Sequence, residues 1–120
     1  LEPGRYLAAE CGVLLARVTQ LKTKGQYDYL GIATGMNALI RPALYGAYHD
    51  IANLTRLHQP AERNYRVVGP ICESGDVVGE SRLLPVCEES DIILIANAGA
   101  YGKVMSSHYN RRSPPEELIL

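Results

Sequence analysis

Short apolar runs separated by polar turns make up the hydrophobic pattern of this chain. Branched apolar residues gather in residues 13–21, 27–32 and 92–96, and the last of these runs is the most apolar in the chain. Short runs rich in branched and aromatic residues, bounded by turn signals, favour strands. We therefore expect a strand at each of these three places.

Further strands are expected between these runs. Apolar and polar residues alternate in residues 51–57, as they do in a strand with one exposed face. Residues 65–71 are apolar and β-branched, and Pro70 should place their end at an edge or a bend. Residues 77–78 and 83–86 predict two short strands.

Three segments carry helix or turn signals. Pro42 suits the first turn of a short helix, which we expect over residues 41–46. Residues 4–12 are small and apolar, and they fit either two helical turns or the lead-in to a strand. Lys22-Thr23-Lys24-Gly25 is expected to form a basic turn. Together, these patterns predict a mainly β barrel or sandwich with one or two short helices.

Composition and charge narrow the class of protein. The 120 residues are 47% hydrophobic and 21% charged, an ordinary balance for one globular domain that excludes wholesale disorder. With 12 basic and 13 acidic side chains the formal net charge is -1, so the chain lacks the basic surface typical of nucleic-acid binding. No apolar run approaches the roughly 18 residues that a transmembrane helix needs.

Aromatic usage is unusual, since the chain has 8 tyrosines and neither phenylalanine nor tryptophan. A tyrosine combines an apolar ring with a polar tip, so this bias indicates hydrogen bonding at an interface or a site. Chance in a short chain explains the bias equally well, and both explanations stay open.

The 3 cysteines, Cys11, Cys72 and Cys87, are odd in number and widely spaced. The sequence has no CxxC pair or Cys/His cluster, and its histidines lack metal-ligand spacing, so no metal site is expected. An odd count also argues against a disulfide framework. We expect reduced thiols in a cytoplasmic protein, with Cys11 and Cys87 in apolar, structural positions.

Two early segments carry polar side chains that a turn alone does not require. Glu2-Pro3-Gly4-Arg5 places a carboxylate and a guanidinium beside a glycine whose backbone can approach a phosphate closely, although a plain turn is an alternative. Arg41 and Tyr45 stand four residues apart and would share one helix face. Together they could clamp a carboxylate, or they could be a surface arginine and a half-buried tyrosine.

Two later segments have the same character. Cys72-Glu73-Ser74-Gly75-Asp76 packs a thiol, two carboxylates and a hydroxyl into five residues, and the thiol could donate or accept a proton. A capped turn with a buried cysteine is the structural alternative. Ala98-Gly99-Ala100-Tyr101-Gly102 allows close approach beside a single phenol, unless Tyr101 merely packs at a strand end.

Taken together and in this order, these segments resemble the C-terminal part of the diaminopimelate decarboxylases, a branch of the fold-type III pyridoxal-phosphate-dependent amino-acid decarboxylases. The resemblance covers nearly the whole chain. The ornithine and arginine decarboxylases share the cysteine loop and the Gly-Ala-Tyr turn, whereas residues 41–49 look more like the diaminopimelate branch. The matching stretches are Glu2-Pro3-Gly4-Arg5, Gly35-Met36-Asn37, residues 41–49, residues 68–76, Ala98-Gly99-Ala100-Tyr101-Gly102 and Ser107-His108-Tyr109-Asn110.

The resemblance implies a piece of a longer protein. Residues 1–12 would be the tail end of an N-terminal (β/α)8 barrel, and residues 13–120 a Greek-key-like C-terminal β-barrel domain that is incomplete at its C-terminus. The Schiff-base lysine would belong to the absent barrel, because Lys22, Lys24 and Lys103 do not lie in its motif. The 120 residues alone would therefore be inactive.

The resemblance also implies a function. The parent would be a carboxy-lyase that uses pyridoxal 5'-phosphate as an electron sink to convert meso-diaminopimelate to L-lysine and CO2, the last step of lysine biosynthesis. It would be a homodimer whose sites are shared across the interface, and it could also carry an aspartate kinase domain. An ornithine- or arginine-type decarboxylase and a non-catalytic dimerisation homologue are the alternatives.

Residue roles follow from the resemblance position by position. Arg41 and Glu73 would hold the distal carboxylate and the distal ammonium of the substrate, and Cys72 would be the candidate proton donor. Cys72 and Glu73 would reach into the site of the partner subunit. Asn97 stands where the family often has aspartate. The implied cofactor-binding residues are Glu2, Gly4, Arg5 and Tyr101, and the implied substrate-binding residues are Arg5, Arg41, Tyr45, Glu73 and Tyr101.

Overall fold

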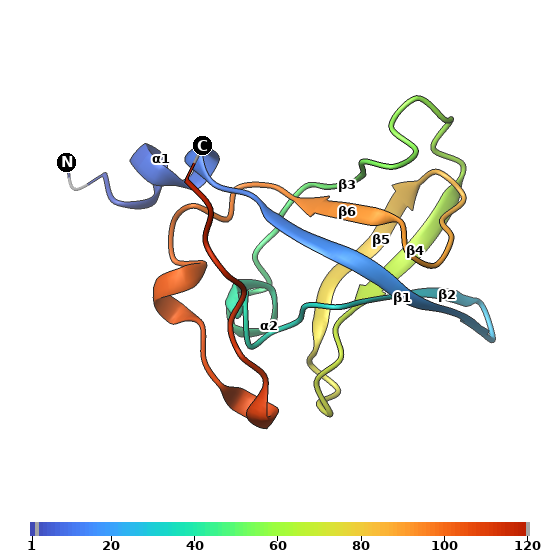
Figure 1. The fold of residues 1–120 in the computed structure, drawn as a ribbon. Helices are drawn as coiled ribbons and strands as arrows, with labels where there is room; N and C mark the ends of the chain where they lie inside the picture. Colours follow the sequence, from blue (N-terminus) through green and yellow to red (C-terminus); the bar gives the residue numbers. More distant parts are fainter. Residues whose placement is uncertain (2, 120) are drawn as a thin grey trace.

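The structure is a computed structural model that describes residues 1 and 3–119. In these residues, six strands form one sheet in the order β3-β6-β1-β2-β4-β5 (Figure 1). The strands are β1 (Leu14–Lys24), β2 (Tyr27–Ile32), β3 (Ile51–Asn53), β4 (Arg63–Val68), β5 (Val77–Leu84) and β6 (Ile92–Ile95).

The long strand β1 joins the two halves of the sheet. Its first half pairs antiparallel with β6, from Leu14 opposite Ile95. Its second half pairs antiparallel with β2, up to Lys24 opposite Tyr27, and the register shifts after Val18. A bulge of this kind bends a strand and increases its twist, which allows one strand to serve both halves of a curved sheet.

The sheet curls into a nearly closed barrel, because its two edge strands β3 and β5 contact each other. A Cβ atom added at Gly79 of β5 would lie 2.8 Å from Cδ1 of Ile51 in β3. Leu30, Val67 and Ile93 are fully buried inside the barrel. The predicted mainly β barrel with one or two short helices is therefore confirmed.

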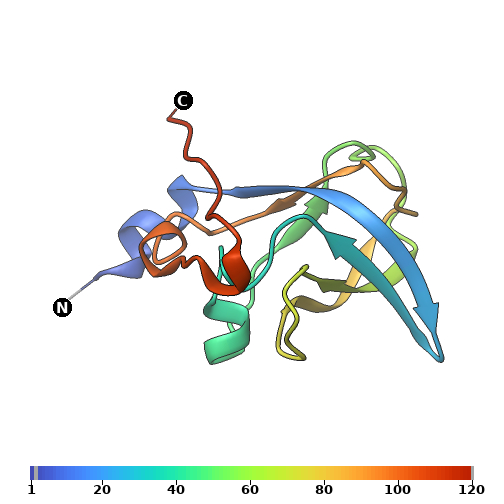
Figure 2. The ribbon, with the colours of Figure 1, turned by 60° about the horizontal axis from the view of Figure 1, so that its bottom comes forward.

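The helical segments gather at the end of the barrel opposite the β1–β2 hairpin, in both views of the ribbon (Figures 1 and 2). This end carries the residues that the sequence marks as functional, so the barrel acts as a rigid support for them. The helical segments are α1 (Arg5–Ala8), η1 (Ala9–Cys11), α2 (Arg41–Tyr45), η2 (Lys103–Met105) and η3 (Tyr109–Arg111). Among the described residues, no helix is long and apolar enough to cross a membrane.

Of three sequence predictions of local structure, two are wrong in part and one is confirmed. Lys22 and Lys24 lie in β1 and not in a turn, because they pair across to β2 and only residues 25–26 turn. Residues 77–78 and 83–84 belong to one strand, since β5 pairs with β4 from end to end and two register shifts absorb the irregularity, and residues 85–86 lie beyond its end. The helical alternative for residues 4–12 is confirmed.

The predicted strand over residues 51–57 ends early, at Asn53. The Asn53 side-chain oxygen accepts a hydrogen bond from the Arg56 backbone N–H at 3.2 Å, which turns the chain. The turn brings the Arg56 guanidinium to 2.7 Å from the Asp91 carboxylate, and Asp91 directly precedes β6. A buried polar cluster thus replaces further strand pairing at this edge.

Candidate cofactor and substrate site

Arg41 and Tyr45 share one face of α2, as the sequence predicts. Pro42 occupies the first turn, where its missing N–H costs nothing, and Gly46 ends the helix in the left-handed region with φ of 63°. The single turn places the Arg41 guanidinium carbon 5.6 Å from the centre of the Tyr45 ring. This distance lies within the range of a cation–π contact.

Tyr101 completes a pair of phenols around the same guanidinium. The Arg41 guanidinium carbon lies 5.7 Å from the centre of the Tyr101 ring, although 60 positions separate the two residues in the sequence. The Nε atom of Arg41 is buried and has no hydrogen-bond partner among the described residues. A buried donor without an acceptor is costly, so this geometry suits a ligand that supplies an anionic acceptor.

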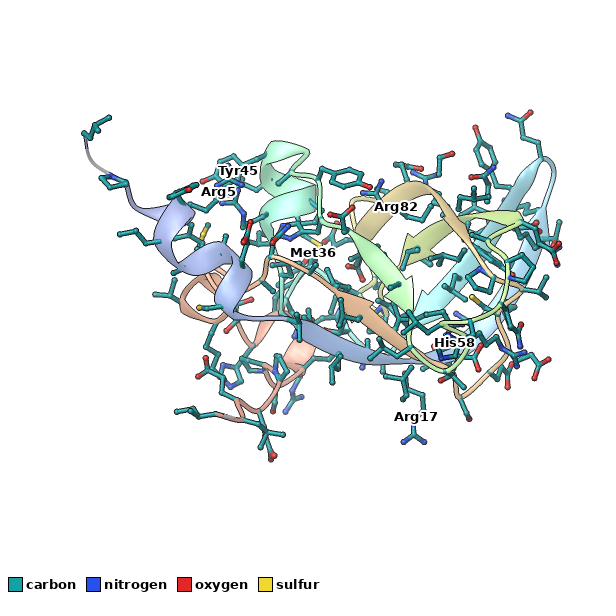
Figure 3. All side chains as sticks on the ribbon, turned by 90° about the horizontal axis from the view of Figure 1, so that it is seen from above. Arg5, Arg17, Met36, Tyr45, His58 and Arg82 are labelled. Atoms are coloured by element: carbon teal, nitrogen blue, oxygen red, sulfur yellow. The ribbon has the colours of Figure 1, made fainter. Side chains whose placement is uncertain are left out.

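Gly4 packs directly against Tyr101. A Cβ atom at Gly4 would lie 2.8 Å from the Tyr101 hydroxyl oxygen, so no larger residue fits there without a shift. Arg5 follows as the first residue of α1, and Figure 3 shows Arg5 and Tyr45 at the same end of the molecule. Glu2, the other predicted cofactor-binding residue of this segment, lies outside the described residues.

The small residues before Tyr101 let the strand end pack on the N-terminal helical turns. A Cβ atom at Gly99 would overlap the Ala8 carbonyl oxygen and would lie 2.7 Å from the Gly12 nitrogen. The Gly99 N–H donates to the Ala9 carbonyl at 3.1 Å, and the Ala98 N–H donates to the Gly12 carbonyl at 2.8 Å. Glycine is required here because two backbone segments touch.

Asp76 holds the cysteine loop against the segment that leads into α2. Its carboxylate is buried and accepts hydrogen bonds from the backbone N–H groups of Met36 and Ile71, both at 2.6 Å. A Cβ atom at either Gly35 or Gly69 would collide with this carboxylate. Burial raises the pKa of Asp76 above its ordinary value, and the two N–H groups oppose that rise.

Cys72 and Glu73 lie at the exposed tip of this loop. The Glu73 carboxylate accepts a hydrogen bond from the Tyr109 hydroxyl. This hydrogen bond, together with the negative charge of Glu73, raises the pKa of the Tyr109 phenol. The contacts within this chain thus bring together Gly4, Arg41, Tyr45 and Tyr101, whereas Glu73 pairs with Tyr109.

Sequence reasoning assigned no role to Tyr109 or to the two glycines around Asp76. Tyr109 lies in Ser107-His108-Tyr109-Asn110, which the family resemblance already singled out, but its contact with Glu73 spans 36 positions. Cys11 was expected in apolar surroundings and is exposed instead, with its thiol donating to the Ala8 carbonyl. Cys87 is buried as expected, and burial raises its pKa.

No group of three or more His, Cys, Asp or Glu side chains that could hold a metal ion occurs in the described part of the chain. The Arg41 end offers instead one guanidinium and two phenols as hydrogen-bond donors. Such donors match phosphate and carboxylate groups. The arrangement therefore favours an anionic organic ligand.

The fold and this set of donors define a class of protein. Residues 5–99 match the family model described as the C-terminal sheet domain of the pyridoxal-dependent decarboxylases. This chain belongs to that family, and the resemblance seen in the sequence motifs is confirmed.

Relatives that match over nearly the whole chain bear the name of one branch of the family, the diaminopimelate decarboxylases. The chain is 47% identical over 120 residues to the diaminopimelate decarboxylase of Archaeoglobus fulgidus and 46% identical over 119 residues to that of Pseudomonas fluorescens. These matches cover 100% and 99% of the chain, and 28% of each relative. The solved diaminopimelate decarboxylase from M. jannaschii matches with a TM-score of 0.88 at 40% identity, over 96% of this chain and 26% of that one.

Proposed function

We propose that this chain is the C-terminal β-domain of a pyridoxal-phosphate-dependent diaminopimelate decarboxylase, which converts meso-diaminopimelate to L-lysine and CO2. The observation that carries the proposal is the Arg41 guanidinium between two phenols, with a buried Nε atom that has no partner among the described residues. The substrate supplies the missing acceptor as its distal carboxylate. The identity to relatives of that name supports this choice of substrate.

The residues near Gly4 fit the phosphate of the cofactor. A Cβ atom at Gly4 would lie 2.8 Å from the Tyr101 hydroxyl, so the glycine leaves space beside this phenol. The Tyr101 hydroxyl and the Arg5 guanidinium are donors suited to a phosphate dianion, and Glu2 is proposed to face the same region. When bound, pyridoxal phosphate supplies the electron sink for the charge left by the departing CO2.

The chain's own residues then act on the substrate. Arg41 and Tyr45 bind its distal carboxylate, and Arg5 binds a second carboxylate. L-Lysine offered as a substrate, with its α-amino group at the cofactor, has no distal carboxylate and would leave Arg41 unpaired, which disfavours its decarboxylation relative to that of diaminopimelate. In the proposed homodimer, Glu73 reaches the distal ammonium in the partner's site. Cys72, an exposed thiol on the same loop, returns the proton to the substrate carbon.

The domain boundaries follow the same proposal. Residues 1–12 form the tail end of a preceding (β/α)8 barrel that holds the cofactor's lysine, and residues 13–120 form the β-domain. The start of the first strand at Leu14 supports this division. The 120 residues alone are expected to be inactive, and the cytoplasmic localisation stays a prediction.

The full-length protein loaded with pyridoxal phosphate tests the proposal. Arg41→Lys should lower kcat/KM for meso-diaminopimelate about 100-fold, because a lysine cannot reproduce the paired donors of a guanidinium. Arg17→Ala is the matched control, since Arg17 is exposed on β1 and points away from Arg5 and Tyr45 in Figure 3. A wild-type protein that decarboxylates ornithine or arginine and ignores diaminopimelate would overturn the proposal.

A further inference from the structure

A hydrogen bond joins two loops that the proposed function treats separately. The Tyr109 hydroxyl at the start of η3 donates to the carboxylate of Glu73 in the loop that links β4 and β5. Both side chains are exposed, and an exposed polar pair persists only if both backbones are held in place independently. The backbone contacts on the two sides of this bond therefore decide whether it is a stable feature.

The Glu73 side is held by its own turn and by the Asp76 carboxylate. The Glu73 N–H donates to the Ile71 carbonyl at 2.8 Å, and the Glu73 carbonyl accepts from the Asp76 N–H at 3.1 Å. The buried Asp76 carboxylate then binds the Met36 N–H. The backbone of Glu73 is thus fixed relative to the segment that precedes α2.

The backbone near Tyr109 is hydrogen-bonded to Asn37, the residue that follows Met36 in the segment before α2. The Ser107 N–H donates to the Asn37 carbonyl at 2.8 Å, and the Tyr109 N–H donates to the Ser107 hydroxyl at 3.3 Å. Asn37 is buried, and Asn110 takes the left-handed conformation with φ of 58° that ends the turn. Met36 and Asn37 therefore anchor both loops at adjacent positions, four or five residues before Arg41.

We infer that Tyr109 is a positioning residue that orients the Glu73 carboxylate toward the distal ammonium of the substrate, an inference that rests on the proposed function. A carboxylate has about four acceptor sites. The phenol occupies one of them on Oε1 and leaves the other oxygen for an ammonium. A glutamate that is already held loses less side-chain entropy when the substrate binds.

The choice of a phenol as the partner has a chemical reason. A lysine or an arginine at this position would neutralise Glu73 and compete with the substrate ammonium. A phenol donates one hydrogen bond and leaves the negative charge in place. Because Glu73 raises the pKa of Tyr109, the phenol stays a neutral donor well above neutral pH.

Binding of L-lysine to the full-length holoenzyme tests the inference, since lysine, as the proposed product, keeps the distal ammonium and the distal carboxylate of the substrate. Tyr109→Phe should weaken lysine binding about tenfold and leave unchanged the binding of 6-aminohexanoate, which keeps the carboxylate and the reacting amine but lacks the distal ammonium. Tyr27→Phe is the matched control, because Tyr27 is a half-exposed tyrosine in the β1–β2 hairpin at the opposite end of the barrel. Equal losses for lysine and 6-aminohexanoate, or no loss for either, would overturn the inference.

A double-mutant cycle separates positioning from a structural role. In the Glu73→Gln background, Tyr109→Phe should change lysine affinity less than twofold, because the group through which Tyr109 acts is already altered. In ultraviolet titration of the same protein, Glu73→Gln should move the ionisation of Tyr109 to lower pH. A full tenfold loss in the Glu73→Gln background contradicts the inference. A protein that binds lysine in this pattern without turning over diaminopimelate refutes the proposed function alone.

Discussion

Asp76 and Asp91 are both almost completely buried, at 3% and 4% exposure, yet their environments shift their pKa values in opposite directions. Burial raises the pKa of Asp76, since the Ile71 and Met36 N–H groups and the charge of Arg112 offset only part of the loss of water. Burial also acts on Asp91, but hydrogen bonds from the Glu88 N–H, Asn53 and Arg56 outweigh it and lower the pKa. Directly hydrogen-bonded side-chain donors thus decide whether a buried carboxylate favours its charged form.

The two carboxylates serve different parts of the molecule. One Asp91 oxygen collects three hydrogen bonds of 2.7 to 2.9 Å at the edge where β3 meets β6, and Arg56 also bridges to Glu88 at 2.5 Å. Asp91 therefore stabilises the barrel. Asp76 instead joins the loop that carries Cys72 and Glu73 to the segment before α2.

The largest expected effect is a loss of stability at Asp91. Asp91→Ala should lower the free energy of unfolding by about 3 kcal/mol, because it removes the buried one of the two carboxylates that pair with the largely buried Arg56 and leaves only the exposed Glu88. Urea unfolding of the chain measures this loss. Below the unfolding transition, lysine binding by the full-length variant should match that of wild type. A loss below 1 kcal/mol would show that the cluster contributes little.

A smaller loss is expected when the packing around Asp76 is disturbed. Gly69→Ala would push a methyl group into the Asp76 carboxylate and the Gly35 backbone, which should cost about 2 kcal/mol and weaken lysine binding by the full-length protein. Gly75→Ala in the same loop is the control, since a Cβ atom there has nothing within 4 Å. Equal stability of the two variants would contradict this account of the loop.

The smallest expected effect is a difference in pH dependence. The folded pKa of Asp91 lies below its ordinary value of 3.8, so the stability that wild type gains over Asp91→Asn should shrink as the pH falls below about 4. The folded pKa of Asp76 lies above 3.8, so wild type should gain stability relative to Asp76→Asn as the pH falls toward 3.8. Urea unfolding at several pH values measures both trends, and parallel trends would contradict the comparison.

Sequence reasoning worked best where a local pattern controls the backbone. β2 has the bounds that its apolar run predicts, and α2 begins at Arg41 as Pro42 indicates. Sequence reasoning was wrong where a residue far along the chain forms the hydrogen bonds that decide the backbone path. The strand expected over residues 51–57 stops at Asn53 because Asp91, 38 positions later, captures Asn53 and Arg56.

The candidate site also combines contacts that a local pattern predicts with contacts between residues far apart in the sequence. The motifs predicted that Arg41 and Tyr45 share a helix face, because a single turn fixes that relation. They named Tyr101 and Gly4 as site residues, but their contacts with each other and with Arg41 depend on how the strand end packs on the N-terminal turns. Tyr109 received no role, because nothing near it in the sequence indicates Glu73.

The sequence by itself determined the family, the β-rich class and the set of candidate site side chains, because these depend on residue types and short-range order. Only the tertiary structure decided which of these side chains meet and how Asp76, Met36 and Asn37 tie the loops together. The physical reason is that such contacts join backbone groups tens of positions apart, and barrel closure alone brings those groups within hydrogen-bonding distance.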